Sequence, residues 1–150
     1  MNKKRKHQWA VNIDKLRVCL NMPENLYEYL HEHYSIYDEL SKSRILDEDD
    51  FNLVFIDEDE TAMTAVLNVK DIDGYYRLGT FTFRNSNKYK DKAFFSFENC
   101  ALYRRYTRNP NVLPQNHICD LLYVANYYGM TFNNVTELEL AFDSNYNYIR

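Results

Sequence analysis

Hydrophobic and polar residues alternate along several segments of the chain, as in strands that bury one face. The clearest case is residues 135–143, where Leu138, Leu140 and Phe142 alternate with acidic or small residues. The same alternation, or a short apolar run between turn residues, predicts further strands. We expect these strands at residues 13–20, 51–56, 61–70, 76–84 and 93–98.

Two other segments place apolar residues at the spacing of a helix. The first follows Pro23 and Glu24, which are typical of a helix start, and its apolar positions continue from Leu26 to Leu40. The second covers residues 115–128, and Gly129 is suited to ending it. The predicted order is β-α-β-β-β-β-α-β. It indicates an α+β domain in which two helices cover one side of a mainly antiparallel sheet.

The length of 150 residues predicts a single domain, residues 1–150, with a substantial core. Three glycines exclude glycine-rich phosphate loops, and three cysteines without ligand spacing indicate neither a disulfide framework nor a zinc site. No segment has the length and hydrophobicity of a signal peptide or a membrane span. We therefore expect a cytoplasmic protein that does not bind membranes.

Nothing after residue 143 looks like an element that would complete the fold. The chain is accordingly interpreted as either one whole domain or the N-terminal part of a larger one. Its first eight residues, 1–8, include four consecutive cations, from Lys3 to Lys6, and we expect them to form a disordered basic arm.

Charge is strongly segregated, although the formal net charge is only −4. Residues 24–73 hold 15 acidic and three basic residues, whereas residues 77–108 hold two acidic and eight basic ones. Tyrosines and phenylalanines are interleaved with the bases of the second segment, a mixture that suits nucleic acid because cations contact phosphates and rings stack on bases. A solvated sheet face would show the same mixture. The candidate DNA-binding residues are Arg84, Lys88, Lys90, Arg104, Arg105 and Arg108.

The last predicted strand has an acidic face. Side chains alternate across a strand, so Glu137, Glu139 and Asp143 share one face with Ala141. Carboxylate oxygens are the ligands of hard cations such as Mg²⁺, which makes these three acids candidate metal ligands. An ordinary strand with one face in water gives the same pattern.

The segment Asn134 to Asp143 also resembles a strand motif of rolling-circle replication initiators of plasmids and phages, the Rep_trans or replication initiation factor family. The match is in register throughout, and the segments before it are similar in order to those of the family. The resemblance covers roughly residues 75–147. Glu139 stands at the position of the motif's central acid and Asp143 at its final one, whereas Glu137 replaces the usual arginine.

This resemblance implies a replication initiation protein that binds plasmid or phage origin DNA and uses Mg²⁺ or Mn²⁺. The family is a DNA nicking endonuclease family, in which the metal polarises a phosphodiester that a downstream tyrosine attacks. No tyrosine here matches the nucleophile motif, so no catalytic residue is assigned. Two alternatives stay open: a small non-catalytic binding or adaptor module of mobile-element origin, and a module whose acidic surface, residues 24–73, binds a basic protein.

Overall fold

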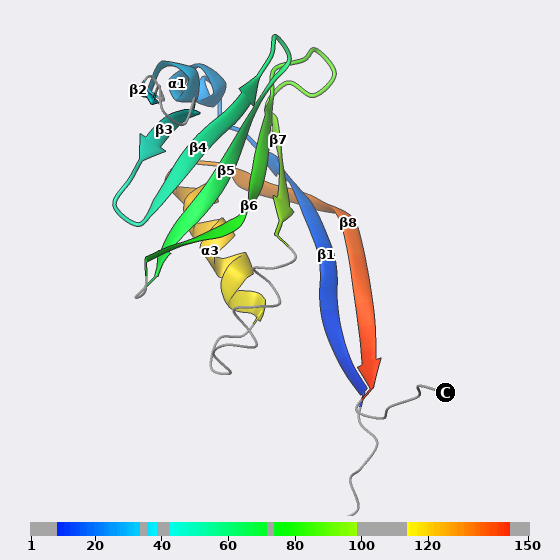
Figure 1. The fold of residues 1–150 in the computed structure, drawn as a ribbon. Coiled ribbons are helices and arrows are strands. Elements are labelled where there is room, and N and C mark those ends of the chain that lie inside the picture. Colours follow the sequence, from blue (N-terminus) through cyan, green and yellow to red (C-terminus); the bar gives the residue numbers. More distant parts are fainter. Residues whose placement is uncertain (1–8, 34–35, 39–42, 72–73, 99–113, 145–150) are drawn as a thin grey trace, which may run out of the picture.

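The computed structural model describes residues 9–33, 36–38, 43–71, 74–98 and 114–144 (Figure 1). The described strands form one antiparallel sheet in the order β2-β3-β4-β5-β6-β7-β1-β8, accompanied by two helices. The predicted α+β class with a mainly antiparallel sheet is confirmed. The elements are β1 (Trp9–Asn21), α1 (Leu26–His33), β2 (Ile36–Asp38), β3 (Ser43–Asp47), β4 (Phe51–Glu58), β5 (Ala62–Asp71), β6 (Gly74–Arg84), β7 (Lys92–Phe97), α3 (Pro114–Tyr127) and β8 (Thr131–Ser144).

The first helix is shorter than its apolar spacing predicts. It ends at His33, and the chain then forms β2, in which Ile36 pairs with Ile45 of β3. The prediction that the helix continues to Leu40 is therefore wrong at Tyr37, which belongs to β2, while Leu40 itself lies outside the described residues. Backbone pairing with β3 takes over from helical periodicity here, because helix propensity is a weak preference that pairing with another segment of the chain overrides.

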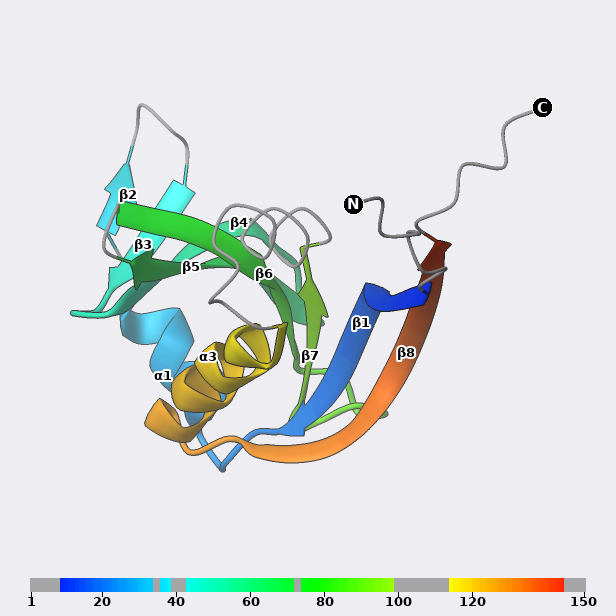
Figure 2. The same cartoon turned by 90° about the horizontal axis from the view of Figure 1, so that it is seen from below.

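Both helices pack against the same face of the sheet, as predicted (Figure 2). The apolar stripe of α1 contributes Leu26 and Leu30, and that of α3 contributes Leu121, Val124 and Ala125. They cover the alternate, inward-facing side chains of the strands, which form one contiguous core with them: Leu16, Val18, Leu20, Leu53, Phe55, Phe81, Phe83, Phe95 and their neighbours. Among the described helices, none has the length and apolar character to cross a membrane.

The opposite face of the sheet, here called the outer face, carries no helix among the described residues. Burial alternates along β7, where Ala93, Phe95 and Phe97 are buried in the core while Phe94 and Ser96 are not. The register places Thr82 of β6 and Cys19 of β1 on either side of Phe94. Side chains of β6, β7 and β1 that point away from the helices thus form one continuous surface.

Strands β1 and β8 extend beyond the rest of the sheet as a two-stranded ribbon, drawn in blue and red in Figure 1. Strand β7 pairs with β1 from Arg17 to Asn21, whereas β8 pairs with β1 from Trp9 to Asn21. The first strand is therefore longer at its start than the predicted residues 13–20. Its additional residues are paired with β8 alone among the described strands.

We expect the contact between α3 and the β3–β4 turn to make the stability of the fold depend on alkaline pH. A hydrogen bond to Glu48 raises the pKa of Tyr127 to about 12, and burial raises the pKa of Tyr128 still further. Both phenols have a pKa near 10 in the unfolded chain, so their contribution to the free energy of unfolding should be fully present below pH 10 and be lost as the pH rises through 12.

Urea unfolding at a series of alkaline pH values checks this expectation. The Tyr128→Phe variant keeps the ring that packs edge-on against Phe51 but removes the ionisable hydroxyl. We expect its stability to fall less steeply with pH than that of the parent. Parallel curves for the two proteins would contradict a contribution from Tyr128.

Candidate nucleic-acid interface

The turn between β6 and β7, residues 85–91, has a defined hydrogen-bonded structure. The backbone N–H of Tyr89 donates to the carbonyl oxygen of Ser86 at 3.2 Å, and that of Lys92 donates to the carbonyl oxygen of Tyr89 at 3.0 Å. Asp91 adopts a positive φ of 65°, and its carbonyl accepts a 2.8 Å hydrogen bond from the N–H of Met22. These bonds anchor the turn to the end of β1 and define the backbone positions from which its side chains extend.

Five side chains from this turn and the neighbouring strands form a row of cations and aromatic rings across the outer face. The Arg17 Cζ lies 4.6 Å from the centroid of the Phe94 ring, and the Phe94 and Tyr89 centroids are 5.9 Å apart with the rings edge to face. Tyr89 in turn has the Arg84 Cζ at 5.9 Å and the Lys88 Nζ at 5.2 Å from its centroid. We call Arg17, Phe94, Tyr89, Arg84 and Lys88 the cation–aromatic row.

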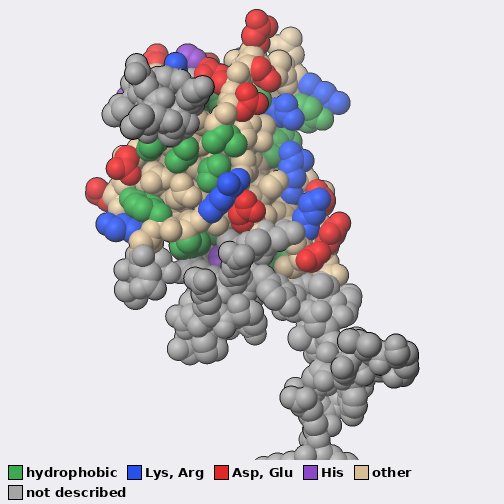
Figure 3. Space-filling model, viewed as in Figure 1, with side chains coloured by type: hydrophobic (Ala, Val, Ile, Leu, Met, Phe, Trp, Pro, Cys, Tyr) green, Lys and Arg blue, Asp and Glu red, His purple; other side chains and the backbone are tan. Residues whose placement is uncertain are grey.

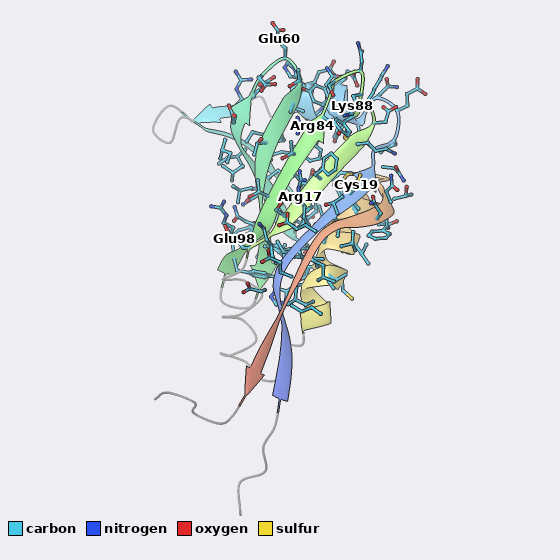
Figure 4. All side chains as sticks on the ribbon, turned by 90° about the vertical axis from the view of Figure 1, so that its right-hand side faces the viewer. Arg17, Cys19, Glu60, Arg84, Lys88 and Glu98 are labelled. Atoms are coloured by element: carbon cyan, nitrogen blue, oxygen red, sulfur yellow. The ribbon has the colours of Figure 1, made fainter. Side chains whose placement is uncertain are left out.

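The row lies on the helix-free side of the sheet. In Figure 4, Arg84 and Lys88 lie in the upper part of the sheet and Arg17 lies below them, whereas α3 lies farther to the right and lower. Figure 3 shows Lys and Arg side chains gathered along the right-hand side of the molecule, near the β6–β7 turn and β1, with acidic groups above and below them. Lys and Arg side chains are therefore frequent on this part of the surface, where some of them lie beside acidic groups.

The cations of the row have no carboxylate partner within salt-bridge distance among the described residues, in contrast to other bases of the same surface. Arg77 is paired with Glu98 at 2.8 Å, and Lys15 with Glu137 at 2.7 Å. The Nε of Arg84 is buried and lacks a hydrogen-bond acceptor in the described part of the chain. Cations that form no salt bridge can donate hydrogen bonds to a phosphate oxygen without first breaking an ion pair.

A pocket lies beside the row, between the turn and the start of α1. Arg84, Asn85 and Lys90 line one side of it, and Glu24 and Glu28 are among the residues of the other side. The mixed charge of this lining favours no single class of ligand. Its relevance is that it places Lys90 close to Arg84, at the end of the row.

The acidic face of β8 adjoins the row, and basic residues of the neighbouring strand β1 lie opposite its carboxylates. Glu137 is opposite Arg17 of β1, and Glu139 is opposite Lys15. The Lys15–Glu137 bond, through its hydrogen bond and then its charge, raises the pKa of Lys15, and Glu139 adds to this effect. Cross-strand ion pairing therefore accounts for part of the acidic pattern.

The same acids were predicted as metal ligands together with Asp143. The backbone of Asp143 continues β8 opposite Ala10, but its side chain is outside the described part of the structure. No group of three or more His, Cys, Asp or Glu side chains with metal-binding geometry occurs among the described residues. The carboxylates have suitable oxygen ligands, but a divalent cation at Glu137 would have to displace the ammonium of Lys15.

The predicted DNA-binding residues fall into two groups. Arg84, Lys88 and Lys90 are brought together at the end of β6 and in the turn. The other three, Arg104, Arg105 and Arg108, lie outside the described residues. The basic arm predicted at residues 1–8 also lies outside them.

Sequence reasoning did not select Arg17, Tyr89 or Phe94 as site residues. For Tyr89 the sequence does contain an indication, because this residue stands between two lysines. For Phe94 the indication is its alternation with core residues on β7. Arg17 had none beyond alternation within its strand. Its place in the row depends on the pairing of β1 with β7, which joins segments far apart in the sequence.

Because comparison with known proteins identifies no relative, a function can be proposed only from the chemistry of the surface. No protein-family model matches the chain, and neither a curated protein nor a solved structure matches it significantly.

Proposed function

We propose that this protein binds nucleic acid through its outer face, with the cation–aromatic row as the centre of the contact. The observation that carries the proposal is the arrangement of Arg17, Arg84 and Lys88 around two neighbouring rings, with no salt bridge to these cations among the described residues. Isolated surface cations are common, but a row that places cations at both ends of two neighbouring rings provides both kinds of contact that nucleic acids use.

Each part of the row has a role in this proposal. The cations contact phosphate oxygens, which gives affinity and a dependence on salt. Tyr89 is 38% exposed, so part of its ring is accessible to a base or sugar. The hydrogen-bonded turn orders the backbone around Lys88 and Tyr89 before binding, which reduces the backbone entropy lost when the complex forms.

DNA is the ligand that we test first, because of the resemblance of residues 134–143 to rolling-circle replication initiators. Origin recognition, Mg²⁺ or Mn²⁺ binding by Glu137, Glu139 and Asp143, and nicking stay predictions that rest on this resemblance. The binding proposal is independent of them, since its residues lie on β1, β6, β7 and the turn.

Fluorescence anisotropy of the protein with labelled DNA oligonucleotides, single- and double-stranded and of several sequences, tests the proposal. We expect binding whose affinity falls steeply between about 50 mM and 200 mM salt, since each phosphate contact contributes about 0.7 to 0.9 to the logarithmic salt slope. Absence of binding at low salt to every oligonucleotide would refute the proposal.

The two alternative functions predict different outcomes of the same experiment. An adaptor module would bind no DNA at any salt concentration. An acidic protein-binding module would instead bind basic proteins through residues 24–73. Part of that segment already serves the fold, because Asp50 and Glu48 accept hydrogen bonds from Tyr123 and Tyr127 of α3 at 2.8 and 2.7 Å. For this reason the nucleic-acid function is supported better.

A further inference from the structure

Strand β8 ends the sheet, and apolar side chains along it are exposed to solvent. It pairs with β1 alone among the described strands, and no other described strand pairs with the backbone groups of its second edge. Phe132, Val135 and Leu138 are 53%, 47% and 52% exposed. Long edge strands with exposed apolar residues are places where another strand can add to a sheet.

These side chains continue the buried face of the sheet. Phe132 is opposite Leu20, Val135 opposite Val18, and Leu138 opposite Leu16, and all three of the β1 residues are buried in the core. Within the described part of the chain, the core face therefore reaches the open edge without a covering layer. One more strand beside β8, with apolar residues on this face, would cover the exposed groups.

The pattern along β8 is symmetric about Val135. The apolar residues Phe132, Val135 and Leu138 are each separated by two polar residues, because register shifts at positions 133 and 136 interrupt simple alternation. If two copies of β8 are paired antiparallel about a two-fold axis at Val135, Phe132 of each copy lies beside Leu138 of the other. The strand is in this sense complementary to itself.

Charge favours the same register. With the axis at Val135, Glu137 lies opposite Asn133 and Glu139 opposite Thr131 of the second copy. An axis at Leu138 would instead place Glu137 opposite Glu139, and like charges directly opposite each other destabilise a strand pair. Of these two registers, only the first pairs apolar residues with apolar residues without bringing carboxylates together.

We propose that the partner of β8 is a second copy of this chain, joined by antiparallel pairing of the two β8 strands about Val135. The dimer would have one continuous sheet made of two eight-stranded sheets. A two-fold axis perpendicular to the sheet keeps both helix layers on one side and both outer faces on the other. Two copies of the cation–aromatic row would then face the same side, although the pairing does not depend on what the row binds.

Sedimentation equilibrium over a wide range of protein concentration tests the association. We expect a dimer for the parent chain and a monomer for Val135→Lys, because the axis brings two ammonium groups together. The matched control is Ile56→Lys, which changes a side chain 55% exposed on β4, and it should remain a dimer. A parent chain that is monomeric at all concentrations, or a Val135→Lys protein that still dimerises, would overturn the proposal.

Cross-linking tests the register even if Val135→Lys fails to fold. Directly opposite residues of paired strands are close enough for a disulfide, so Val135→Cys should give a covalent dimer on mild oxidation. The parent chain, which contains the exposed Cys119, controls for cross-links through its own cysteines. A dimer of Val135→Cys that forms no more disulfide than the parent would show that the strands are not paired about this residue.

Discussion

Replacing Arg84 and Lys88 with glutamine should lower the affinity for DNA about 25- to 60-fold at ~0.1 M salt. This estimate assigns one phosphate contact to each side chain, at about 0.7 to 0.9 in the logarithmic salt slope per contact. The Arg84 Cζ and the Lys88 Nζ lie 5.9 and 5.2 Å from the centroid of the Tyr89 ring. Neither side chain forms a salt bridge among the described residues. The slope of affinity against salt should become shallower by about 1.4 to 1.8.

The matched control removes the same charge from another part of the sheet. Arg44 on β3 and Lys70 on β5 are exposed, and β3 and β5 are separated from β7 by other strands of the sheet. The Arg44→Gln, Lys70→Gln protein should bind almost as well as the parent, with a nearly unchanged salt slope. Equal losses in the two double variants would show that net charge, rather than the row, determines binding.

Gly79→Ala should lower the free energy of unfolding by about 3 kcal/mol or more, at the upper end of the range for overpacked sites. A Cβ at this position would lie 2.2 Å from the carbonyl oxygen of Ser96 and 2.6 Å from the Phe95 ring. The first neighbour is backbone of the paired strand, so the clash cannot be relieved by a change of rotamer. Strand β6 would have to move away from β7, and these strands carry Arg84 and Phe94 of the row.

Chemical denaturation of Gly79→Ala measures this effect, with Thr82→Ala as the control on the same strand. Thr82 is only partly buried on the outer face, opposite Phe94, and its truncation creates no clash. We expect the control to lose about 1 kcal/mol or less. A Gly79→Ala protein as stable as the control would mean that β6 and β7 are less closely paired than the structure shows.

Local patterns were sufficient to predict most of the fold. The β4–β5 hairpin follows from two apolar segments around an acidic turn, in which the Asp59 carboxylate accepts hydrogen bonds from the N–H groups of Thr61 and Ala62. Gly129, with a φ of 73°, ends α3 as predicted. The error at α1 has a physical origin, because the spacing of its apolar residues carries no information about the pairing of Ile36 with Ile45.

The candidate site could be predicted only where its residues are close in sequence. Arg84, Lys88 and Lys90 belong to one hairpin, so a basic segment was enough to select them. The opposite end of the row depends on β1 lying beside β7, which places Arg17 over Phe94. No local pattern encodes that neighbour relation.

The same limit applies to the acidic strand. Its alternation indicates which carboxylates share a face, but not that Lys15 of β1 lies within 2.7 Å of Glu137. Ion pairing across β1 and β8 is one use of these acids, and their role as metal ligands stays a prediction from the resemblance to replication initiators.

An NMR titration of the ¹⁵N-labelled protein with a DNA oligonucleotide tests the central proposal most directly, because it locates the contact on the protein. We predict that the largest shift changes occur at residues 84–94 and around Arg17, on the outer face. Changes concentrated on α1 and α3, or no changes at a DNA concentration that saturates binding by anisotropy, would contradict the proposal that the cation–aromatic row binds nucleic acid.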